Sequence, residues 1–419
     1  MSCRLLDPSI VQAAFPDAVQ RHRAGRPACA CINCITPPHM LKRLLESDNK
    51  EIRQAALDTL LLTARLRGER GTRMAFAAAS APANGRRTIF NLNNATDLAS
   101  ATLERSEEGP ESDDDSANRA FDGFGRTREF YKTVFERNSV DGRGMRLDGY
   151  VHRGLRYNNA FWNGREMQFG DGDGIMFTDF TKSLDVIAHE LTHGVTQFTA
   201  GLEYQNQSGA LNESVSDVFG SLVKQWSLDQ TAEQADWLIG VEVFTPGIEG
   251  DALRSMKEPG SAYDNQILGK DPQPNHMSKY VHLSNDEDGD FGGVHINSGI
   301  PNKAFYLTAM GIGGFAWEAP GLIWYESLKA STPATDFQKF ADTTYEKAGT
   351  LFGGDSTQQK AVLAAWRLAS GSAAPWLERW LPRLAPFLLL ANRTLWRCLR
   401  SNSNPCLHKS RRLRKRSVG

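Results

Sequence analysis

Two histidines and a glutamate lie within one pentapeptide, His189-Glu190-Leu191-Thr192-His193. On a helix, residues four apart share a face, so both imidazoles can point at one metal ion. Glu190 follows the first histidine and can reach a water on that metal rather than the metal itself. The pentapeptide also arises by chance in roughly one chain in a hundred, so a surface helix with two unrelated histidines stays an alternative.

A second group of acids follows at a spacing that suits the same metal. Glu213 comes twenty residues after His193, and Asp217 lies four residues further on, on the same helix face. Glu213 can supply a third ligand, and Asp217 can accept the second ring proton of a ligand histidine and fix its tautomer. An amphipathic helix with two solvated acids is the alternative. The two motifs together favour a metal site.

A third group is the loop sequence 290–299, in which His295 follows Gly292 and Gly293. The glycines allow the backbone to bring the histidine close to a ligand. A loop histidine alone is more often structural or exposed than catalytic, so its significance depends on the first two motifs.

The surrounding sequence predicts the elements that position these residues. Apolar residues recur at helical spacing from Pro38 to Leu61, and the basic, glycine-containing stretch 67–73 is predicted to be a linker. Short β-forming runs follow at 87–90 and 149–152, and the acidic stretch 104–115 is predicted to be a loop. Helical patterns dominate from residue 184 onward. Those patterns centre on 184–198, 211–227, 299–310 and 357–369.

Charge and targeting signals limit the classes of function. The net charge of −1 argues against a whole-protein role in neutralising nucleic acid phosphates. The first residues lack the apolar core of a signal peptide, and no run approaches the roughly 20 apolar residues of a transmembrane helix. We therefore expect secretion by a route without a signal peptide, with cytoplasmic residence as the alternative.

Several motifs together resemble one enzyme family. The sequences at 189–193, 203–206, 211–213 and 293–299 closely resemble the thermolysin family of metallopeptidases. The sequences at 158–162 and 170–174 match the same family upstream and in the same order. The resemblance extends over about residues 86–369. Near the amino terminus, Cys34 to Leu41 is similar to the short propeptide motif of protealysin-like members, which usually carry Tyr where this chain has His39.

The resemblance implies an α+β fold with a β-rich amino-terminal lobe, a helical carboxy-terminal lobe and zinc in the cleft between them. It divides the chain into a propeptide (1–72), two catalytic lobes (73–195 and 196–370) and a basic tail (371–419) that is expected to be disordered. The propeptide would act as an intramolecular inhibitor that is removed during maturation. Cys34 as a temporary zinc ligand is one possibility, and a packed thiol is the favoured one.

The implied activity is that of a zinc-dependent neutral endopeptidase acting on proteins or peptides, made as a zymogen and expected to be a monomer. Zinc would be bound by His189, His193 and Glu213, and Glu190 would be the general base. Tyr204 and His295 would stabilise the oxyanion, with Asp290 orienting His295.

The resemblance also assigns residues to substrate binding. Asn159, Ala160 and Arg254 match positions that bind the substrate backbone. An apolar specificity pocket is implied, which would favour cleavage on the amino side of bulky hydrophobic residues. Its residues are Phe177, Phe180, Val186, Ile239, Val243 and Leu253. By periodicity alone these six would be ordinary core.

Calcium binding is where the chain departs from the family. Asp185 and Asp236 remain at positions of a double calcium site, but Lys224 and Val241 replace expected carboxylates. A lysine ammonium can neutralise either aspartate without an ion, so the double site is expected to be absent. Asp251 is a candidate for a single separate calcium site.

Two other functions remain possible from the sequence. A zinc aminopeptidase shares the two-histidine helix, but it needs an acidic group for the substrate amine, and the motifs around Asn159 and His295 speak against it. A catalytically silent zinc protein would have lost the base or an oxyanion donor, whereas Glu190, Tyr204 and His295 are all present.

Overall fold

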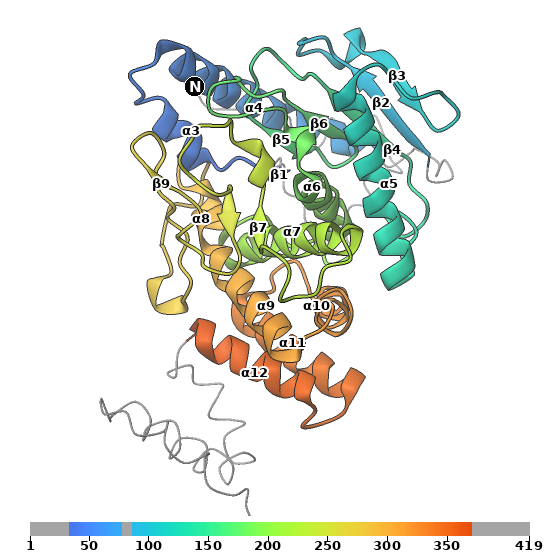
Figure 1. Ribbon diagram of the computed structural model, residues 1–419, viewed down its shortest axis with the longest axis vertical. Helices are drawn as coiled ribbons and strands as arrows, with labels where there is room; N and C mark the ends of the chain where they lie inside the picture. The colour runs from blue at the N-terminus through green and yellow to red at the C-terminus, as the bar shows by residue number, and fades with distance from the viewer. Residues whose placement is uncertain (1–32, 78–85, 371–419) are drawn as a thin grey trace, which may run out of the picture. The chain divides into compact units, whose positions relative to one another are not determined.

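The computed structural model describes residues 33–77 and 86–370 (Figure 1). The chain divides into two compact units, Met1–Ala369 and Ser370–Gly419, and nearly all described residues belong to the first. The expectation for the basic tail 371–419 lies outside the described residues.

A six-stranded sheet lies in the amino-terminal part of the first unit (Figure 1). Its order is β1-β5-β6-β4-β2-β3, with β2 parallel to β4, β4 parallel to β6 and the other pairs antiparallel. The strands are β1 (Asn33–Cys34), β2 (Arg87–Asn91), β3 (Thr102–Ser106), β4 (Leu147–Val151), β5 (Ala160–Trp162) and β6 (Met167–Phe169). The strands predicted at 87–90 and 149–152 correspond to β2 and β4. The acidic stretch predicted as a loop instead includes most of β3.

Two short hairpins lie outside this sheet. They pair β7 (Leu238–Ile239) with β8 (Arg254–Ser255), and β9 (Asp264–Asn265) with β10 (Gly269–Lys270). The described irregular segments also contain the 3-10 turns η2 (Leu98–Ser100), η3 (Phe180–Lys182), η4 (Val241–Val243) and η5 (Met277–Lys279).

Helix α5 (Asp115–Phe135) packs on the sheet and was not predicted. Its amino end is capped by Asp114, whose side chain accepts hydrogen bonds from the backbone N–H groups of Ser116 and Ala117. Gly149 in β4 permits the contact, since a Cβ there would lie 2.8 Å from the Phe124 ring. The sheet is therefore covered by a helix that buries a face rich in phenylalanine.

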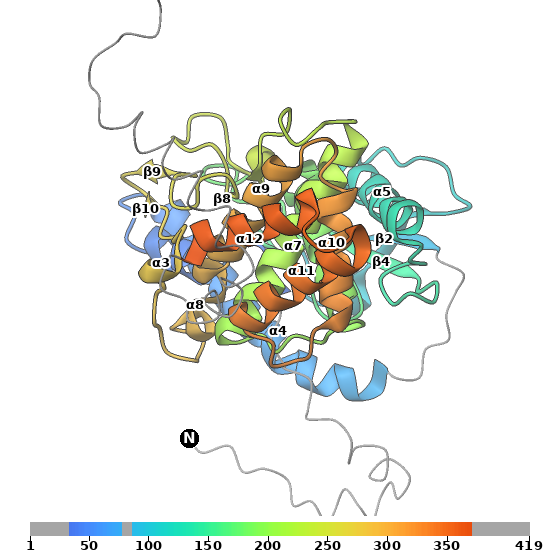
Figure 2. The same ribbon diagram turned by 90° about the horizontal axis from the view of Figure 1, so that it is seen from below.

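Helices make up the carboxy-terminal part, as predicted, which confirms the α+β class. They are α6 (Leu184–Gln197), α7 (Asn206–Ser227), α8 (Asp290–Asn297), α9 (Gly299–Ile312), α10 (Ala319–Ala330), α11 (Phe337–Phe352) and α12 (Thr357–Ser370). Figure 2 shows α9 to α11 beside α7, which each of them contacts. No helix of the described ranges has both the length and the apolar character needed to cross a membrane.

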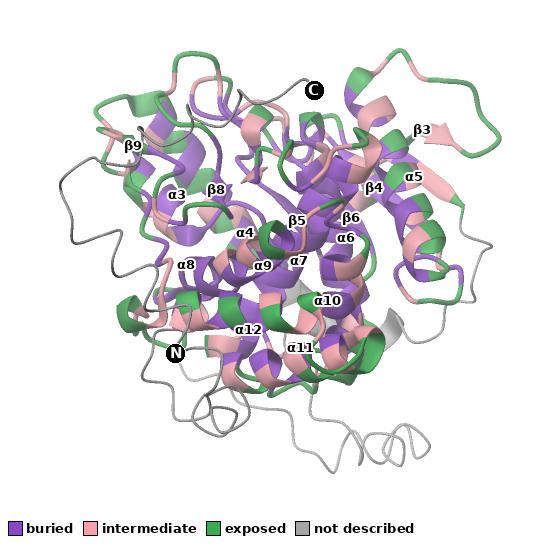
Figure 3. Cartoon of the chain, turned by 60° about the horizontal axis from the view of Figure 1, so that its bottom comes forward, coloured by how far each residue is buried: buried purple, intermediate pink, exposed green. Residues whose placement is uncertain are grey.

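The packing of α6 against α7 forms the centre of the molecule, and both helices are buried along most of their length (Figure 3). Gly220 on α7 faces the backbone of α6 directly. A Cβ at this position would lie 2.6 Å from the carbonyl oxygen of Asp185 and 3.3 Å from the backbone nitrogen of His189. The absence of a side chain at Gly220 therefore sets the close approach of the two helices that carry the predicted ligands.

The segment upstream of the sheet contains α3 (Pro38–Leu44) and α4 (Lys50–Ala77). The predicted linker at 67–73 is wrong, because α4 continues through it to Ala77. Gly68 and Gly71 lower helix propensity, but the residues around them are good helix formers and one or two glycines do not end a helix. The expected propeptide boundary at residue 72 lies inside this helix.

His152 connects two acidic segments near β4. Its Nε2 lies 2.7 Å from Oδ2 of Asp114, and its Nδ1 lies 2.8 Å from Oδ1 of Asp171. Only a protonated imidazole can donate to both carboxylates at once. The hydrogen bond with Asp171 raises the pKa of His152, and Asp114 raises it further, whereas burial lowers it. The pKa of His152 is therefore raised to about 9. Asp171, in the glycine-rich sequence 170–174, therefore pairs with His152.

We expect His152 to make stability depend on pH. Its folded pKa of about 9 exceeds the ordinary value of 6.5, so its stabilisation is complete below about pH 6.5 and is lost as pH rises through 9. The partly exposed contacts suggest about 1–2 kcal/mol. The free energies of unfolding of wild type and His152→Gln, measured in urea, should differ by this amount at pH 6 and become equal near pH 10. An unchanged difference would contradict the assignment.

Candidate active site

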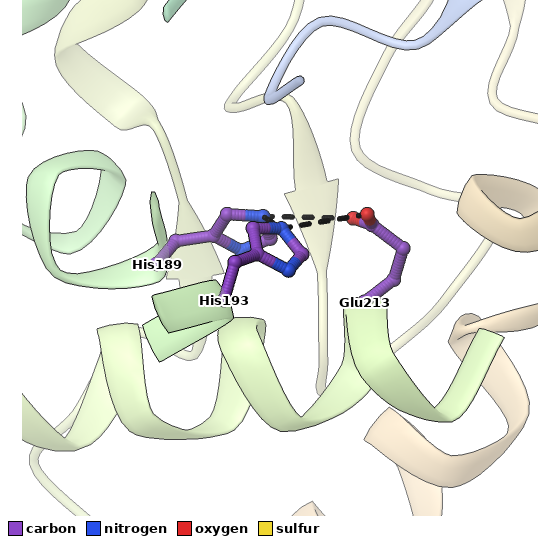
Figure 4. Close-up of side chains that lie close together, drawn as sticks. All are labelled: His189, His193 and Glu213. Carbon is purple, nitrogen blue, oxygen red and sulfur yellow. Dashed lines mark hydrogen bonds and ion pairs between the residues drawn. The ribbon is translucent and has the colours of Figure 1, made fainter. Parts of the chain in front are cut away.

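The predicted metal ligands converge at the centre of the molecule (Figure 4). His189 and His193 of α6 place their Nε2 atoms 3.0 Å apart. Glu213 of α7 faces both rings, with Oε2 3.5 Å from Nε2 of His189 and Oε1 3.5 Å from Nε2 of His193. Within the described residues, this is the one group of three histidine, cysteine or acidic side chains whose donor atoms lie within 4.8 Å of one another.

This donor set fits a zinc ion. Two ring nitrogens and a carboxylate are the ligands of a catalytic zinc site, which keeps a fourth position for water or substrate. All three side chains are buried, and Oε2 of Glu213 has no hydrogen-bond partner in the protein. A buried carboxylate oxygen without a partner is costly, and a cation between the three side chains would remove that cost.

The outer ring nitrogens of both histidines have partners. Nδ1 of His189 lies 2.8 Å from Oδ1 of Asp217, the partner that the sequence predicts. Nδ1 of His193 lies 2.8 Å from Oδ1 of Asn212 and 3.0 Å from Oγ of Ser216. These contacts fix the ring orientations and direct both Nε2 atoms inward. Asn212 and Ser216 were missed, although Asn212 directly precedes Glu213 and Ser216 lies about one turn of α7 after it, which could have indicated them.

Asp217 also binds a buried arginine. Its two oxygens accept hydrogen bonds of 2.8 Å from Nε and Nη2 of Arg254, and Asn302 donates a third at 2.9 Å. Burial would raise the pKa of Asp217, but Arg254 and His189 lower it, so the carboxylate is ionised. One carboxylate thus positions a predicted ligand and a predicted substrate-binding residue.

Glu190 is fully buried beside the ligands. Its Oε2 accepts a hydrogen bond of 2.9 Å from the backbone N–H of Trp162 in β5, whereas its Oε1 has no partner in the protein. Burial is the main reason why the pKa of Glu190 lies well above its usual range; nearby Glu213 adds to this, while His189 opposes it. A carboxyl group with one fixed and one unpartnered oxygen, and a raised pKa, suits a general base.

Tyr204 and His295 meet on the other side of Glu213. The Tyr204 hydroxyl donates to Oε1 of Glu213 and lies 3.2 Å from Nε2 of His295. Asp290 accepts from the other face of that ring, with Oδ1 2.6 Å from Nδ1, and its Oδ2 accepts from the backbone N–H of His295. Burial lowers the pKa of His295, but Asp290 and Glu213 raise it to about 9. The imidazole is therefore protonated near neutral pH and can donate from Nε2.

The turn that begins α8 brings His295 into place. Residues 290–293 all have positive φ angles, which is uncommon outside glycine. Gly292 also allows close contact, because a Cβ there would lie 2.3 Å from Oδ1 of Asn206. The two glycines noted in the sequence thus serve the backbone approach that we expected of them.

Comparison with known proteins finds the thermolysin family over most of the chain. The family description "Thermolysin metallopeptidase, catalytic domain" matches residues 77–197, and "Thermolysin metallopeptidase, alpha-helical domain" matches residues 200–370. An "Extracellular metalloprotease" of Pectobacterium carotovorum subsp. carotovorum is 47% identical over 330 residues, which cover 78% of this chain and 92% of that protein. The chain belongs to the thermolysin metallopeptidase family.

Two further relatives agree with this. "Protease PrtS" of a Photorhabdus species is 49% identical over 283 residues, covering 67% of this chain and 75% of that protein. The solved structure "Precursor of Protealysin, Metalloproteinase from Serratia proteamaculans" is 45% identical, with a TM-score of 0.72, and the match covers 80% of this chain and 99% of that one. The resemblance to the protealysin-like branch is confirmed, and the chain is a zinc-dependent metallopeptidase.

The substrate-backbone residues expected of a thermolysin-type enzyme all contact the chain's own upstream segment. The Ala160 carbonyl accepts from the N–H of Ile35 at 3.1 Å, and Oδ1 of Asn159 accepts from the N–H of Thr36 at 3.0 Å. Nη1 of Arg254 donates to the Ile35 carbonyl at 3.1 Å. Residues 33–36 thus lie where these three residues were predicted to bind a substrate.

The six residues of the predicted specificity pocket are all buried. Phe177 and Phe180 lie with ring centroids 5.8 Å apart, and Ile239 in β7 pairs with Arg254 in β8. Val186 is on α6, one turn before Glu190. Their place around Arg254 and α6 suits a pocket, and that role stays a prediction.

The Cys34 side chain lies in an apolar cluster with Leu66, Tyr157 and Phe161. It is not among the three converging ligands. This position favours a packed thiol over a temporary zinc ligand. The clustered Cys29 and Cys31 lie outside the described residues.

Proposed function

We propose that this thermolysin-family enzyme cleaves internal peptide bonds with His189, His193 and Glu213 as zinc ligands and Glu190 as general base. The observation that carries the proposal is the convergence of the three ligands next to Glu190 on one side and the Tyr204–His295 pair on the other. Hydrogen bonds fix Glu190 as a base and Tyr204 and His295 as oxyanion donors around one centre.

Each residue has a distinct part in the proposed reaction. Zinc, when bound, polarises the attacking water and the peptide carbonyl. Glu190 removes a proton from the water and later delivers it to the departing amine, while Trp162 fixes the other carboxyl oxygen. His295 and Tyr204 donate hydrogen bonds to the oxygen on which charge develops. Asp290 keeps His295 protonated and oriented.

The upstream segment supports a zymogen. Residues 33–36 lie along β5 and contact Arg254, Asn159 and Ala160, so a substrate cannot use these groups at the same time. Further contacts hold α3: Nζ of Lys42 lies 3.0 Å from Asp288, and His39 lies 3.0 Å from the Tyr263 hydroxyl. We propose that residues 1–72 inhibit the enzyme until they are removed. The buried apolar residues next to Arg254, Ile239 and Leu253, support a preference for bulky apolar residues after the cut.

Zinc analysis and a protein-digestion assay test the proposed function. Purified protein should contain about one zinc per chain and, once the upstream segment is removed, should cleave casein internally. 1,10-Phenanthroline should abolish cleavage, and added zinc should restore it. Zinc binding without chelator-sensitive cleavage would favour the silent binding protein, and stepwise release of amino-terminal residues would favour the aminopeptidase.

The relatives support secretion, since one of them is named as an extracellular metalloprotease. We propose the same destination for this enzyme. The export route, the cytoplasmic alternative and the monomeric state stay predictions.

Lys224 places its ammonium group between the two aspartates at positions of the family's double calcium site, which is expected to be absent here. Nζ of Lys224 lies 2.9 Å from Oδ2 of Asp185, 3.0 Å from Oδ2 of Asp236 and 3.1 Å from the carbonyl oxygen of Leu238. Burial would lower the pKa of Lys224, but the two aspartates raise it above the ordinary lysine value. These contacts support the proposal that Lys224 replaces calcium here. Asp251 remains a candidate for a separate site.

Replacing Lys224 by methionine is expected to destabilise the fold by about 3–5 kcal/mol, since the buried Asp185 loses its cation. Calcium at millimolar concentration should leave the melting temperature of a calcium-free Asp251→Asn chain unchanged, because a ligand stabilises only the state it binds and the candidate site at Asp251 is removed. Lys329→Met, which breaks the exposed pair with Glu326, is the matched control and should have a small effect. A rise of several degrees with calcium in the Asp251→Asn chain would contradict the proposal.

A further inference from the structure

The upstream strand β1 lies on β5 in the direction and register of an added sheet strand. Asn33 pairs with Trp162 and Cys34 with Phe161, antiparallel, at the edge of the six-stranded sheet. The hydrogen bonds continue through the N–H groups of Ile35 and Thr36. The chain is therefore paired as a strand at residues 33 and 34, and hydrogen bonds from residues 35 and 36 continue the contact through the following bend, as when a peptide adds to the edge of a sheet.

The peptide bond between Cys34 and Ile35 lies at the catalytic groups. The Cys34 carbonyl oxygen is 2.9 Å from Nε2 of His295, the same nitrogen that lies 3.2 Å from the Tyr204 hydroxyl and 3.6 Å from Oε1 of Glu213. This carbonyl thus receives the donor that stabilises the oxyanion in the proposed reaction.

The residue after this bond is bound on both sides. The Ile35 N–H donates to the Ala160 carbonyl and the Ile35 carbonyl accepts from Arg254, while the Ile35 side chain is completely buried. An apolar β-branched residue therefore follows the bond at the catalytic groups, in agreement with the proposed preference for an apolar residue on the carboxy side of the cut.

We infer that the Cys34–Ile35 bond is an autoproteolytic site, cut by the catalytic groups of the same molecule. The inference rests on the proposed function. Water adds to the Cys34 carbonyl carbon as Glu190 takes its proton; the C–N bond then breaks, and Glu190 returns the proton to the Ile35 nitrogen. One water is consumed; its second proton also passes to the Ile35 nitrogen, so the products are a carboxylate at Cys34 and an ammonium group at Ile35.

The cut does not by itself activate the enzyme. After it, residues 35–77 keep their contacts with Ala160, Asn159 and Arg254, and the ion pair of Lys42 with Asp288 is unaffected. The new amino terminus therefore stays in the cleft as a bound product. Activity assays alone would overlook the event, whereas the mass of the chain and its new amino terminus record it.

Amino-terminal sequencing and intact mass of the zinc-loaded full chain test the inference. We expect a fragment that begins at Ile35, formed at a rate independent of protein concentration. Ile35→Leu should be cut similarly, and Ile35→Asp at least about tenfold more slowly, because a charge at this buried position opposes binding. Full-length Glu190→Gln chain should stay intact at this bond, even when mixed with wild type, because the cut is intramolecular.

Melting temperatures of the two Ile35 variants separate slow cutting from misfolding, since a folded Ile35→Asp chain melts cooperatively. If the matured enzyme digests casein but no chain beginning at Ile35 forms, the inference is wrong and the proposed function stands. Cutting of the Glu190→Gln chain by added wild type would overturn the intramolecular step. If zinc-loaded protein cuts neither casein nor itself, both proposals fail.

Discussion

Glu190→Gln is expected to lower kcat/KM for an internally quenched peptide by about a hundred- to ten-thousand-fold, while zinc content stays at one per chain. Glutamine has nearly the shape of glutamate and can still accept the hydrogen bond from the Trp162 N–H. It cannot accept a proton from water. The expected loss therefore falls on kcat rather than on KM or on metal binding. Zinc is measured by atomic absorption on the same samples.

A matched control for this variant is Glu346→Gln, an exposed position on α11. It should leave kcat/KM within about twofold of wild type, since surface substitutions far from a site have small effects. Activity of Glu190→Gln close to that of Glu346→Gln would remove Glu190 from the role of base. Loss of zinc in Glu190→Gln would instead make its main role structural.

Asp217→Ala is expected to lower both stability and zinc affinity, and the loss of stability arises because a buried cation is left unpaired. Arg254 is 1% exposed, and Asp217 is the carboxylate that accepts hydrogen bonds from its Nε and Nη2. Breaking a buried pair by removing one partner costs about 3–5 kcal/mol. His189 also loses the carboxylate at its Nδ1, and such a loss lowers metal affinity by about 10–100-fold. Urea unfolding and zinc competition with a chromophoric chelator measure the two effects.

Asp217→Asn separates the two roles. The amide oxygen can still accept from His189 while the negative charge opposite Arg254 is lost, so stability should fall more than zinc affinity does. Asp122→Asn is the surface control, because Asp122 is exposed and its 3.5 Å pair with Arg105 is worth at most about 1 kcal/mol. Equal unfolding free energies for Asp217→Ala and Asp122→Asn would show that the buried pair does not stabilise the fold.

Sequence reasoning predicted the ligand helix because its geometry is local. The i, i+4 spacing of His189 and His193 determines that both rings share a face, and the helix of Glu213 follows closely. The link from Asp217 to Arg254 was not predicted, since the partners lie on separate elements and no periodic pattern connects them. Tertiary pairs of this kind depend on how helices and loops pack, which a single sequence does not encode locally.

Helix α5 shows a different limit. Its interior contains glycine and threonine, which lower helix propensity, so propensity alone argues against a helix of this length. Burial of its phenylalanine-rich face on the sheet outweighs that cost. A signal was present in the sequence: Asp114 as a cap, followed by apolar residues at helical spacing through Tyr131. The glycine-containing end of α4 was misjudged because Gly68 and Gly71 were given more weight than the helix formers around them.

The continuation of α4 to Ala77 has a consequence for the timing of maturation. A peptidase cleft binds extended chain, and β1 lies along β5 in this way. A peptide bond within an intact helix such as α4 is not accessible to the cleft. The boundary proposed at residue 72 therefore becomes a substrate only when the last turns of α4 fray. Local opening of this helix, rather than the chemical step, would then set the delay between folding and release of the mature enzyme.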